Sequence, residues 1–167
     1  MRTISIPVIL LGLAYALFAV SLAYAAERLP DVVATHFGGE GVPNGWMSRS
    51  GNLLFLVAVA VGVPLLIIGS CAVSRFFPVR TFHVPNRAYW LSSERRCQTT
   101  AYMTRHSLWL ASWTVLFVTA INLLIVAANS ISPPRLSNTA LFVMLGIFVA
   151  GVGAWSFFFY GHFWRIA

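Results

Sequence analysis

Ionised side chains leave four long stretches of this chain uninterrupted, and their spacing constrains the fold more than any other feature. The stretches cover residues 3–26, 51–74, 107–134 and 136–161. A helix needs about 20 apolar residues to cross a hydrocarbon core of about 30 Å, and each stretch is longer than that. The sequence therefore predicts an all-α integral membrane bundle, a single domain with four transmembrane helices at about residues 3–26, 51–74, 107–129 and 138–161.

The composition argues against several classes of soluble protein. Of the 167 residues, 59% are hydrophobic and 9% are charged, whereas a soluble domain carries about 25% charged residues. Too few ionic groups remain to solvate a surface, so a soluble enzyme, a disordered regulator and a nucleic-acid-binding domain are poor interpretations. All 11 basic residues are arginines, and we attribute the net charge of +7 to membrane topology and anionic lipid headgroups, with no nucleic acid as a partner.

The placement of the arginines predicts the orientation of the helices. The first loop contains Arg28 and Arg49, and the last loop contains Arg135. Because arginine and lysine near helix ends favour the cytoplasmic side, we expect the middle segment and both termini in the cytoplasm, and residues 27–50 and 130–137 outside. The middle segment holds the largest group: Arg75, Arg80, Arg87, Arg95, Arg96 and Arg105.

The first apolar stretch has an alternative interpretation. Met1 and Arg2, followed by an apolar run and by Ala23-Tyr24-Ala25, resemble a secretory signal peptide with its cleavage site. The run is longer than the usual apolar region of about 7–15 residues. We therefore expect it to be retained as the first helix.

Small residues predict where the helices pack. Lipid offers no hydrophobic drive for helix association, so close backbone approach along small residues is the available signal. We expect these residues to pack within the bundle, with contact to a second copy as the alternative. The stripes are Gly12, Ala16, Ala19 and Ala23 in the first helix, Ala58 and Gly62 in the second, and Gly146, Ala150 and Ala154 in the fourth.

Pro64 and Asn122 are the unusual residues inside the predicted spans. Pro64 would be tolerated if a nearby hydroxyl or a backbone shift satisfied the carbonyl that it leaves without a donor. Asn122 lies roughly on one helix face with Ser112 and Thr119, and we interpret it as a hydrogen bond between helices in preference to a substrate contact. The spans contain no Asp, Glu, Arg or Lys, which argues against an ion-coupled transporter.

The first loop, residues 29–48, combines turn residues with apolar residues and is expected to be ordered. His36 has three interpretations: a structural ring that bonds loop carbonyls, which we prefer, a metal ligand beside Asp31 or Glu40, or a pH sensor. The candidate exterior site comprises Pro30, His36, Phe37, Gly41, Pro43, Gly45 and Trp46.

The middle segment is the second candidate site. Ser92 or Ser93 is expected to cap a helix with Glu94 in its first turn, and this helix is expected to run into the third span. Arg95, Arg96, Arg105 and His106 form a basic collar suited to anionic lipid headgroups. The candidate cytoplasmic site comprises Pro85, Asn86, Tyr89, Trp90, Glu94, Arg95 and Arg96.

Both segments resemble a known family. Leu29-Pro30, His36-Phe37, Gly41 and Pro43-Asn44-Gly45-Trp46 resemble the bacterial membrane domain of unknown function at the front of the sporulation-delaying-toxin immunity proteins. Pro85-Asn86, Tyr89-Trp90-Leu91 and Glu94-Arg95-Arg96 resemble a run found in stand-alone members. The resemblance implies the bacterial cytoplasmic membrane and supplies no catalytic residue. The immunity proteins are longer, so toxin protection and capture of a repressor are not carried over.

We expect no enzymatic activity, no cofactor and no metal, because the sequence shows no nucleophile with its base and no phosphate-binding loop. Cys71 and Cys97 are expected to be free thiols. The leading hypothesis is a non-enzymatic membrane protein that senses or binds a peptide, lipid or membrane protein through the exterior loop, with immunity-like signalling as one form. The alternatives are an accessory or scaffold subunit of a transporter or other membrane complex, and a homo-oligomer.

Overall fold

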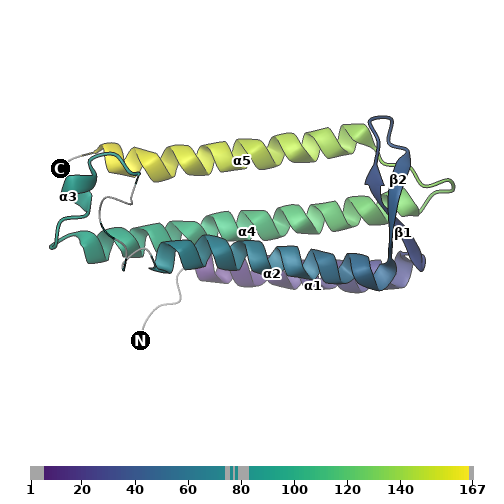
Figure 1. Ribbon diagram of the computed structural model, residues 1–167, viewed down its shortest axis with the longest axis horizontal. Coiled ribbons are helices and arrows are strands. Elements are labelled where there is room, and N and C mark those ends of the chain that lie inside the picture. Colours follow the sequence, from purple (N-terminus) through teal and green to yellow (C-terminus); the bar gives the residue numbers. More distant parts are fainter. Residues whose placement is uncertain (1–5, 74–75, 77, 79–82, 166–167) are drawn as a thin grey trace.

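The computed structural model describes residues 6–73, 76, 78 and 83–165. Its elements in chain order are α1 (Ile6–Arg28), β1 (Val32–Phe37), β2 (Pro43–Ser48), α2 (Arg49–Val73), α3 (Arg87–Trp90), α4 (Arg96–Asn129) and α5 (Asn138–Trp164). The helices α1, α2, α4 and α5 are long and apolar enough to cross a membrane, and they run side by side along the molecule (Figure 1). The predicted four-helix membrane bundle is confirmed.

The expectation that a helix of the middle segment runs into the third span is confirmed, because α4 is one helix from Arg96 to Asn129 and begins well before the predicted span at about residue 107. Ser92 and Ser93 do not cap it, since Arg95 is the N-cap residue and makes no side-chain capping bond. Residues 91–95 form a turn between α3 and α4. The Thr99 hydroxyl donates to the Trp90 carbonyl at 2.6 Å, which holds this turn closed. The polar first turns of α4 therefore belong to the same helix as the apolar span.

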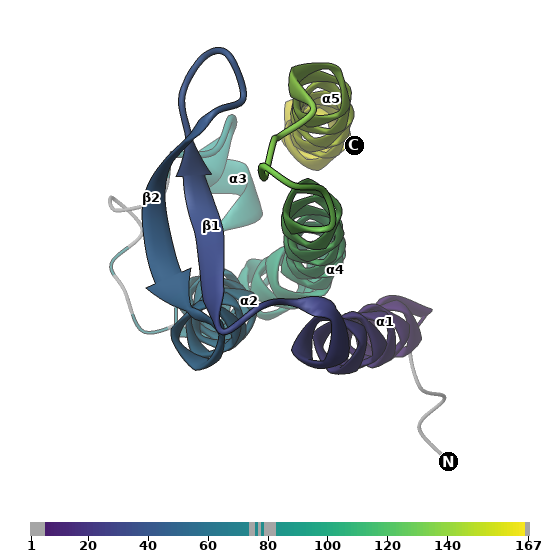
Figure 2. The same cartoon turned by 90° about the vertical axis from the view of Figure 1, so that its right-hand side faces the viewer.

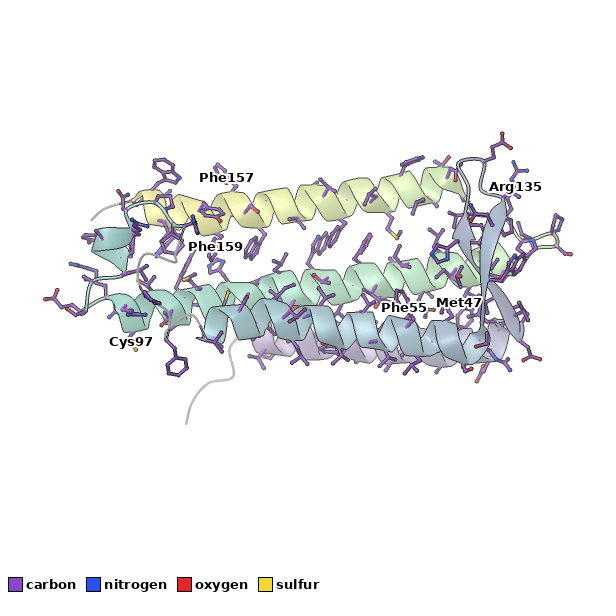
Figure 3. The ribbon with its side chains drawn as sticks, viewed as in Figure 1. Met47, Phe55, Cys97, Arg135, Phe157 and Phe159 are labelled. Carbon is purple, nitrogen blue, oxygen red and sulfur yellow. The ribbon has the colours of Figure 1, made fainter. Side chains whose placement is uncertain are left out.

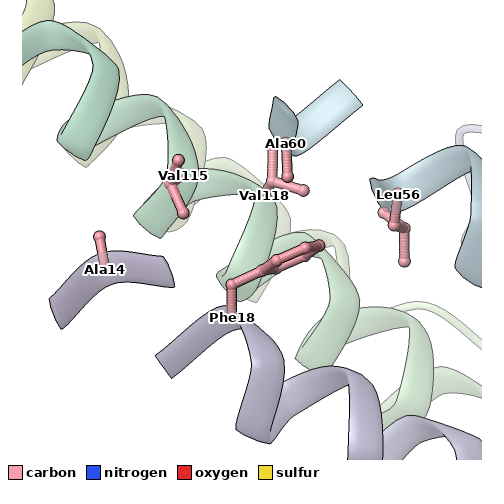
Figure 4. Close-up of a cluster of buried hydrophobic side chains, with 6 residues drawn as sticks. All are labelled: Ala14, Phe18, Leu56, Ala60, Val115 and Val118. Atoms are coloured by element: carbon pink, nitrogen blue, oxygen red, sulfur yellow. The ribbon is translucent and has the colours of Figure 1, made fainter. Parts of the chain in front are cut away.

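The helices α1, α2 and α4 form a three-helix unit with α4 against both of the others. Its core is a cluster to which each helix contributes residues three or four positions apart, the spacing of one helix face. The cluster consists of Ala14, Phe18, Leu56, Ala60, Val115 and Val118 (Figure 4). A second cluster, Ala25, Leu29, Val33 and Val126, lies toward the end that carries the strands.

A layer of polar side chains lies one helical turn from the first cluster. Asn122 on α4 is fully buried and donates through Nδ2 to the Ser21 carbonyl at 2.9 Å and to the Ser21 hydroxyl at 3.1 Å. This is the bond between helices that the sequence interpretation favours. Within the described residues, Asn122 Oδ1 and the Nδ2 of buried Asn52 have no hydrogen-bond partner.

The predicted small-residue stripes are wrong as packing faces within the chain. The buried face of α1 consists of Ala14, Phe18, Ser21 and Ala25, whereas a Cβ at Gly12 or at Gly146 would meet nothing within 4 Å. In a membrane the outer surface is as apolar as the interior, so residue size alone does not identify the buried face. The stripe residues that lie exposed are Gly12, Ala16, Ala19, Ala23, Ala58, Gly146, Ala150 and Ala154.

The helix α5 stands apart from this unit. Viewed from the end that carries the strands, it lies beside α4 and away from α1 and α2 (Figure 2). The strands β1 and β2 lie at one end of the bundle and α3 at the other (Figure 1). We call these the hairpin end and the α3 end. Arg135 lies at the hairpin end and Cys97 at the α3 end (Figure 3).

Candidate functional site

The segment expected as an ordered loop is ordered, and it is a two-stranded antiparallel hairpin. Its register pairs Val33 with Met47 and Ala34 with Trp46, and a bulge follows Ala34. The turn between the strands closes through a hydrogen bond from the Gly38 amide to the Val42 carbonyl, 2.8 Å long. Neighbouring Val32 and Val33 favour an extended strand, which the turn residues had concealed in the sequence.

The side chain of Asn129, the last residue of α4, occupies the edge of β1 that faces away from β2. Its Oδ1 accepts from the Ala34 amide at 2.9 Å, and its Nδ2 donates to the Ala34 carbonyl at 3.0 Å. Because both backbone groups of Ala34 point at Asn129, those of its partner Trp46 point the other way, to the free side of β2. The hairpin therefore has one closed edge and one open edge.

The tip of the hairpin is fastened to the start of α5. The Leu136 amide donates to the Gly41 carbonyl at 2.9 Å, and Asn138 Nδ2 donates to the Gly39 carbonyl at 2.6 Å. Gly41 has a φ of +74°, and a Cβ there would collide with the Leu136 carbonyl. Only glycine fits this position without strain.

The base of the hairpin is fixed by Arg49, the first residue of α2. Its guanidinium donates to the Leu29 carbonyl at 3.0 Å and pairs with the Asp31 carboxylate at 2.8 Å. A longer bond of 3.3 Å reaches the Ala26 carbonyl. Arg49 thus joins the end of α1 to the start of β1, and the Asp31 carboxylate is its ion-pair partner.

His36 is exposed, and its ring lies against Gly45, where a Cβ would come within 2.9 Å of the His36 Cβ. Its Nδ1 lies 3.3 Å from the Thr35 hydroxyl. The described contacts therefore place His36 against its own hairpin and show no bond to a loop carbonyl, which the preferred interpretation required. No group of three or more His, Cys, Asp or Glu side chains suited to a metal occurs in the described part of the chain.

The other predicted residues of this site are spread along the hairpin. Pro30 is exposed before β1, and Phe37 at the end of β1 pairs with Pro43 at the start of β2. Trp46 is 51% exposed and Val32 is 60% exposed. These two side chains come from diagonal positions of one face, because Val32 pairs with Ser48 and Trp46 with Ala34.

The second predicted site holds the other end of α5. Asn86 has a left-handed φ of 52°, and its Nδ2 donates to the Phe163 carbonyl at 3.0 Å. Trp90 Nε1 donates to the same carbonyl at 3.1 Å. The imidazole of His162 lies between the rings of Trp90 and Tyr102, with centroid distances of 4.6 and 3.9 Å. Asn86 and Trp90 thus bind the last turn of α5.

The charged residues of this segment do not form one cluster. The Arg95 guanidinium lies 4.1 Å from the Tyr89 ring centroid, and Glu94 is exposed. Pro85 is half-buried in the turn before α3. Arg96 and Arg105 line one pocket on α4. His106, expected in the same basic collar, lies with its ring centroid 6.0 Å from that of Phe159 on α5, and its carbonyl accepts from Trp155 Nε1 at 2.9 Å. His106 therefore belongs to the contact between α4 and α5.

Comparison with known proteins gives one match. None of the curated proteins and none of the solved structures matches the chain. The model of a domain of unknown function, DUF1648, matches residues 8–61, a region that contains most of α1, the hairpin and the first half of α2. Residues 8–61 are thus similar to an uncharacterised domain, and the hairpin lies inside the matched region.

Proposed function

We propose that this is a non-enzymatic protein of the bacterial cytoplasmic membrane that binds an extended peptide from outside the cell along the open edge of β2. The observation that carries the proposal is the difference between the two edges of the hairpin. Asn129 occupies the edge of β1, while the backbone groups of Trp46 point outward from β2. An open strand edge pairs readily with another extended chain.

The arrangement of the hairpin suits such a partner. β1 lies between β2 and the helices, so β2 is the outer strand (Figure 2). Arg49, Asn129 and Asn138 hold the hairpin at its base, at β1 and at its tip. Because the hairpin is held in place before binding, it loses little conformational entropy when a peptide adds to β2. The exposed rings and methyl groups of Trp46 and Val32 provide an apolar contact beside the edge. Main-chain bonds supply affinity in this mode, and these side chains supply selectivity.

The orientation follows from the charges at the two ends. Arg87, Arg95, Arg96 and Arg105 all lie toward the α3 end, which the insertion bias of arginine assigns to the cytoplasm. The hairpin end then faces the exterior, where secreted peptides are present.

The test uses the purified chain in lipid nanodiscs and a library of extended peptides drawn from secreted proteins. Peptides that bind are expected to slow hydrogen exchange at the Trp46 amide. They are expected to bind Trp46→Ala at least tenfold more weakly, because the apolar contact is lost. Trp164→Ala is the matched control, since Trp164 is an exposed tryptophan at the α3 end, and it should bind like the unaltered chain.

Two results would overturn the proposal. One is a library in which no peptide binds. The other is a set of peptides that bind Trp46→Ala and Trp164→Ala equally and leave the Trp46 amide unprotected.

A second function, that of a scaffold subunit in a membrane complex, is favoured by one observation. Gly146, Ala150 and Ala154 form an exposed small-residue stripe on α5, which would allow another helix to approach closely. Gly146→Leu should then release a partner that co-purifies from native membranes. An unaltered chain that always purifies as a lone monomer would contradict this second function.

A further inference from the structure

The helices α4 and α5 meet along a seam of aromatic side chains. Trp113 Nε1 on α4 donates to the Phe148 carbonyl on α5 at 3.1 Å, and Trp155 Nε1 on α5 donates to the His106 carbonyl on α4 at 2.9 Å. Phe159 lies on the side of α5 that faces α4, and Phe157 lies on the opposite side (Figure 3). Bulky rings, and not small residues, therefore set the separation of the two helices.

Two grooves lie along this seam, and Trp113 borders both. The groove nearer the α3 end has a volume of about 430 Å³ and extends from His106 to Trp113 on α4. The groove nearer the hairpin end has a volume of about 400 Å³ and extends from Trp113 to Ala120. Their walls are mostly apolar, with His106 as the titratable side chain of the first groove, and both grooves lie between helices long and apolar enough to span a membrane.

The cross-section of the first groove limits what can occupy it. His106 and Trp113 are seven residues apart, which corresponds to about 10 Å of helix, so a volume of about 430 Å³ gives a mean cross-section of about 40 Å². A cross-section of this size is wide enough for a hydrocarbon chain.

A positive charge lies on α4 beyond the end of the groove toward α3. Arg105 is exposed, lines a separate pocket with Arg96, and comes one helical turn before Trp109, which lines the groove. Arg105, Trp109, Trp113, Leu116 and Ala120 follow one another at intervals of three or four residues, so they share one face of α4. This face is about 22 Å long, more than the depth of about 15 Å of one leaflet of hydrocarbon. One arginine therefore precedes an apolar path long enough for an acyl chain.

We propose that the α4–α5 seam binds an anionic phospholipid, with one acyl chain in the grooves beside Trp113 and the phosphate at Arg105. The bilayer supplies this ligand directly, since the grooves lie between helices long and apolar enough to span a membrane. The guanidinium of Arg105 pairs with the phosphate. The fastenings at Asn138 and Phe163 hold both ends of α5 in place and keep the grooves open.

Native mass spectrometry tests the proposal on the full chain in detergent, with phosphatidylglycerol and phosphatidylcholine of identical acyl chains. The unaltered chain should retain one phosphatidylglycerol, with at least a tenfold preference over phosphatidylcholine. Ala140→Phe fills the groove in which Ala140 lies, and it should reduce retention of both lipids at least fivefold. The control Ala19→Phe adds the same ring to an exposed position on α1 and should leave retention unchanged.

Charge substitutions distinguish binding of the lipid headgroup from binding of the acyl chain. Arg105→Gln should abolish the preference for phosphatidylglycerol and leave the weaker retention of phosphatidylcholine unchanged. Arg28→Gln removes the same charge at the opposite end of the bundle and should keep the preference.

A second measurement requires no substitution in the seam. Phosphatidylglycerol with brominated acyl chains should quench tryptophan fluorescence at lower lipid fractions than brominated phosphatidylcholine, since Trp109, Trp113 and Trp155 line the groove. Equal quenching by the two lipids, or equal retention by Ala140→Phe and Ala19→Phe, would overturn the proposal. A lipid-free dimer that Ala140→Phe dissociates would assign the seam to a second copy.

Discussion

The hydroxyl of Tyr15 on α1 donates a hydrogen bond of 3.0 Å to the backbone carbonyl of Ala60 on α2. Pro64, four residues after Ala60, lies inside α2 and has no N–H to offer this carbonyl. Two ways to tolerate Pro64 were compatible with the sequence, a nearby hydroxyl or a backbone shift, and the structure shows a hydroxyl from the neighbouring helix. The carbonyl that Pro64 leaves without a donor within α2 therefore forms a contact between α1 and α2.

This relationship predicts that Tyr15→Phe lowers the free energy of unfolding by about 1 kcal/mol, because the Ala60 carbonyl then lacks its partner in hydrocarbon. Pro64→Ala restores the helical donor, so Tyr15→Phe should cost much less in that background. Detergent-induced unfolding in mixed micelles, followed by circular dichroism, measures both costs. Equal costs in the two backgrounds would show that the hydroxyl does not compensate for Pro64.

The two buried asparagines should respond in opposite ways to replacement by leucine. Asn122→Leu removes the bonds to Ser21 and should lower the free energy of unfolding by about 1 kcal/mol. Asn52→Leu removes an amide whose Nδ2 has no partner in the described residues, so stability should stay the same or rise. The same unfolding assay ranks the two variants, and a larger loss for Asn52→Leu would contradict this assignment.

Two glycines of α5 provide a matched pair for the seam. A Cβ at Gly151 would collide with the Trp113 ring, while a Cβ at Gly153 would meet nothing within 4 Å. Gly151→Ala should therefore destabilise the fold by about 1–3 kcal/mol through overpacking. Gly153→Ala should leave stability unchanged or raise it, because alanine favours a helix over glycine. Thermal unfolding in detergent distinguishes them, and similar midpoints for both variants would argue against close contact at Trp113.

The orientation can be checked with Cys97, which is exposed at the α3 end. A maleimide that cannot cross membranes should label Cys97 in inverted vesicles and leave it unlabelled in intact cells. In a chain with Cys71 and Cys97 changed to serine, Ser48→Cys places the thiol at an exposed position of β2 and should show the reverse pattern. Labelling of Cys97 in intact cells would place the hairpin end in the cytoplasm.

The membrane spans could be predicted because length and the absence of charge are sufficient criteria for them. The same criteria do not reveal the first turns of α4, since Arg96 and Arg105 end an apolar window without ending a helix, and only the polar pattern of residues 92–94 predicted a helix there. They also gave no guide to the packed faces, because Phe18 and Ala14 are buried among residues no more apolar than those exposed to lipid.

The candidate segments were recognisable, but their contacts were not. Turn residues predicted order in residues 29–48, yet Pro43 and Gly45 concealed a strand, since both residues are rare in strands. Asn86 and Trp90 were singled out as a turn and an interfacial ring. Their shared acceptor, Phe163, lies 77 and 73 residues further along the chain. Pairings over such distances depend on how the helices assemble, which residue type and spacing do not encode.

The fastening of the hairpin to α4 and α5 sets an order of events during synthesis. The strands leave the ribosome early, whereas Asn129 follows Ala34 by 95 residues and Asn138 follows Gly39 by 99 residues. Until α4 is inserted, both edges of the hairpin are open to any extended chain nearby. A nascent chain thus has two sites for strand addition, and the arrival of Asn129 reduces them to one. Under the proposed function, selectivity for β2 over β1 is therefore a property of the finished protein, because the edge of β1 closes only when Asn129 is in place.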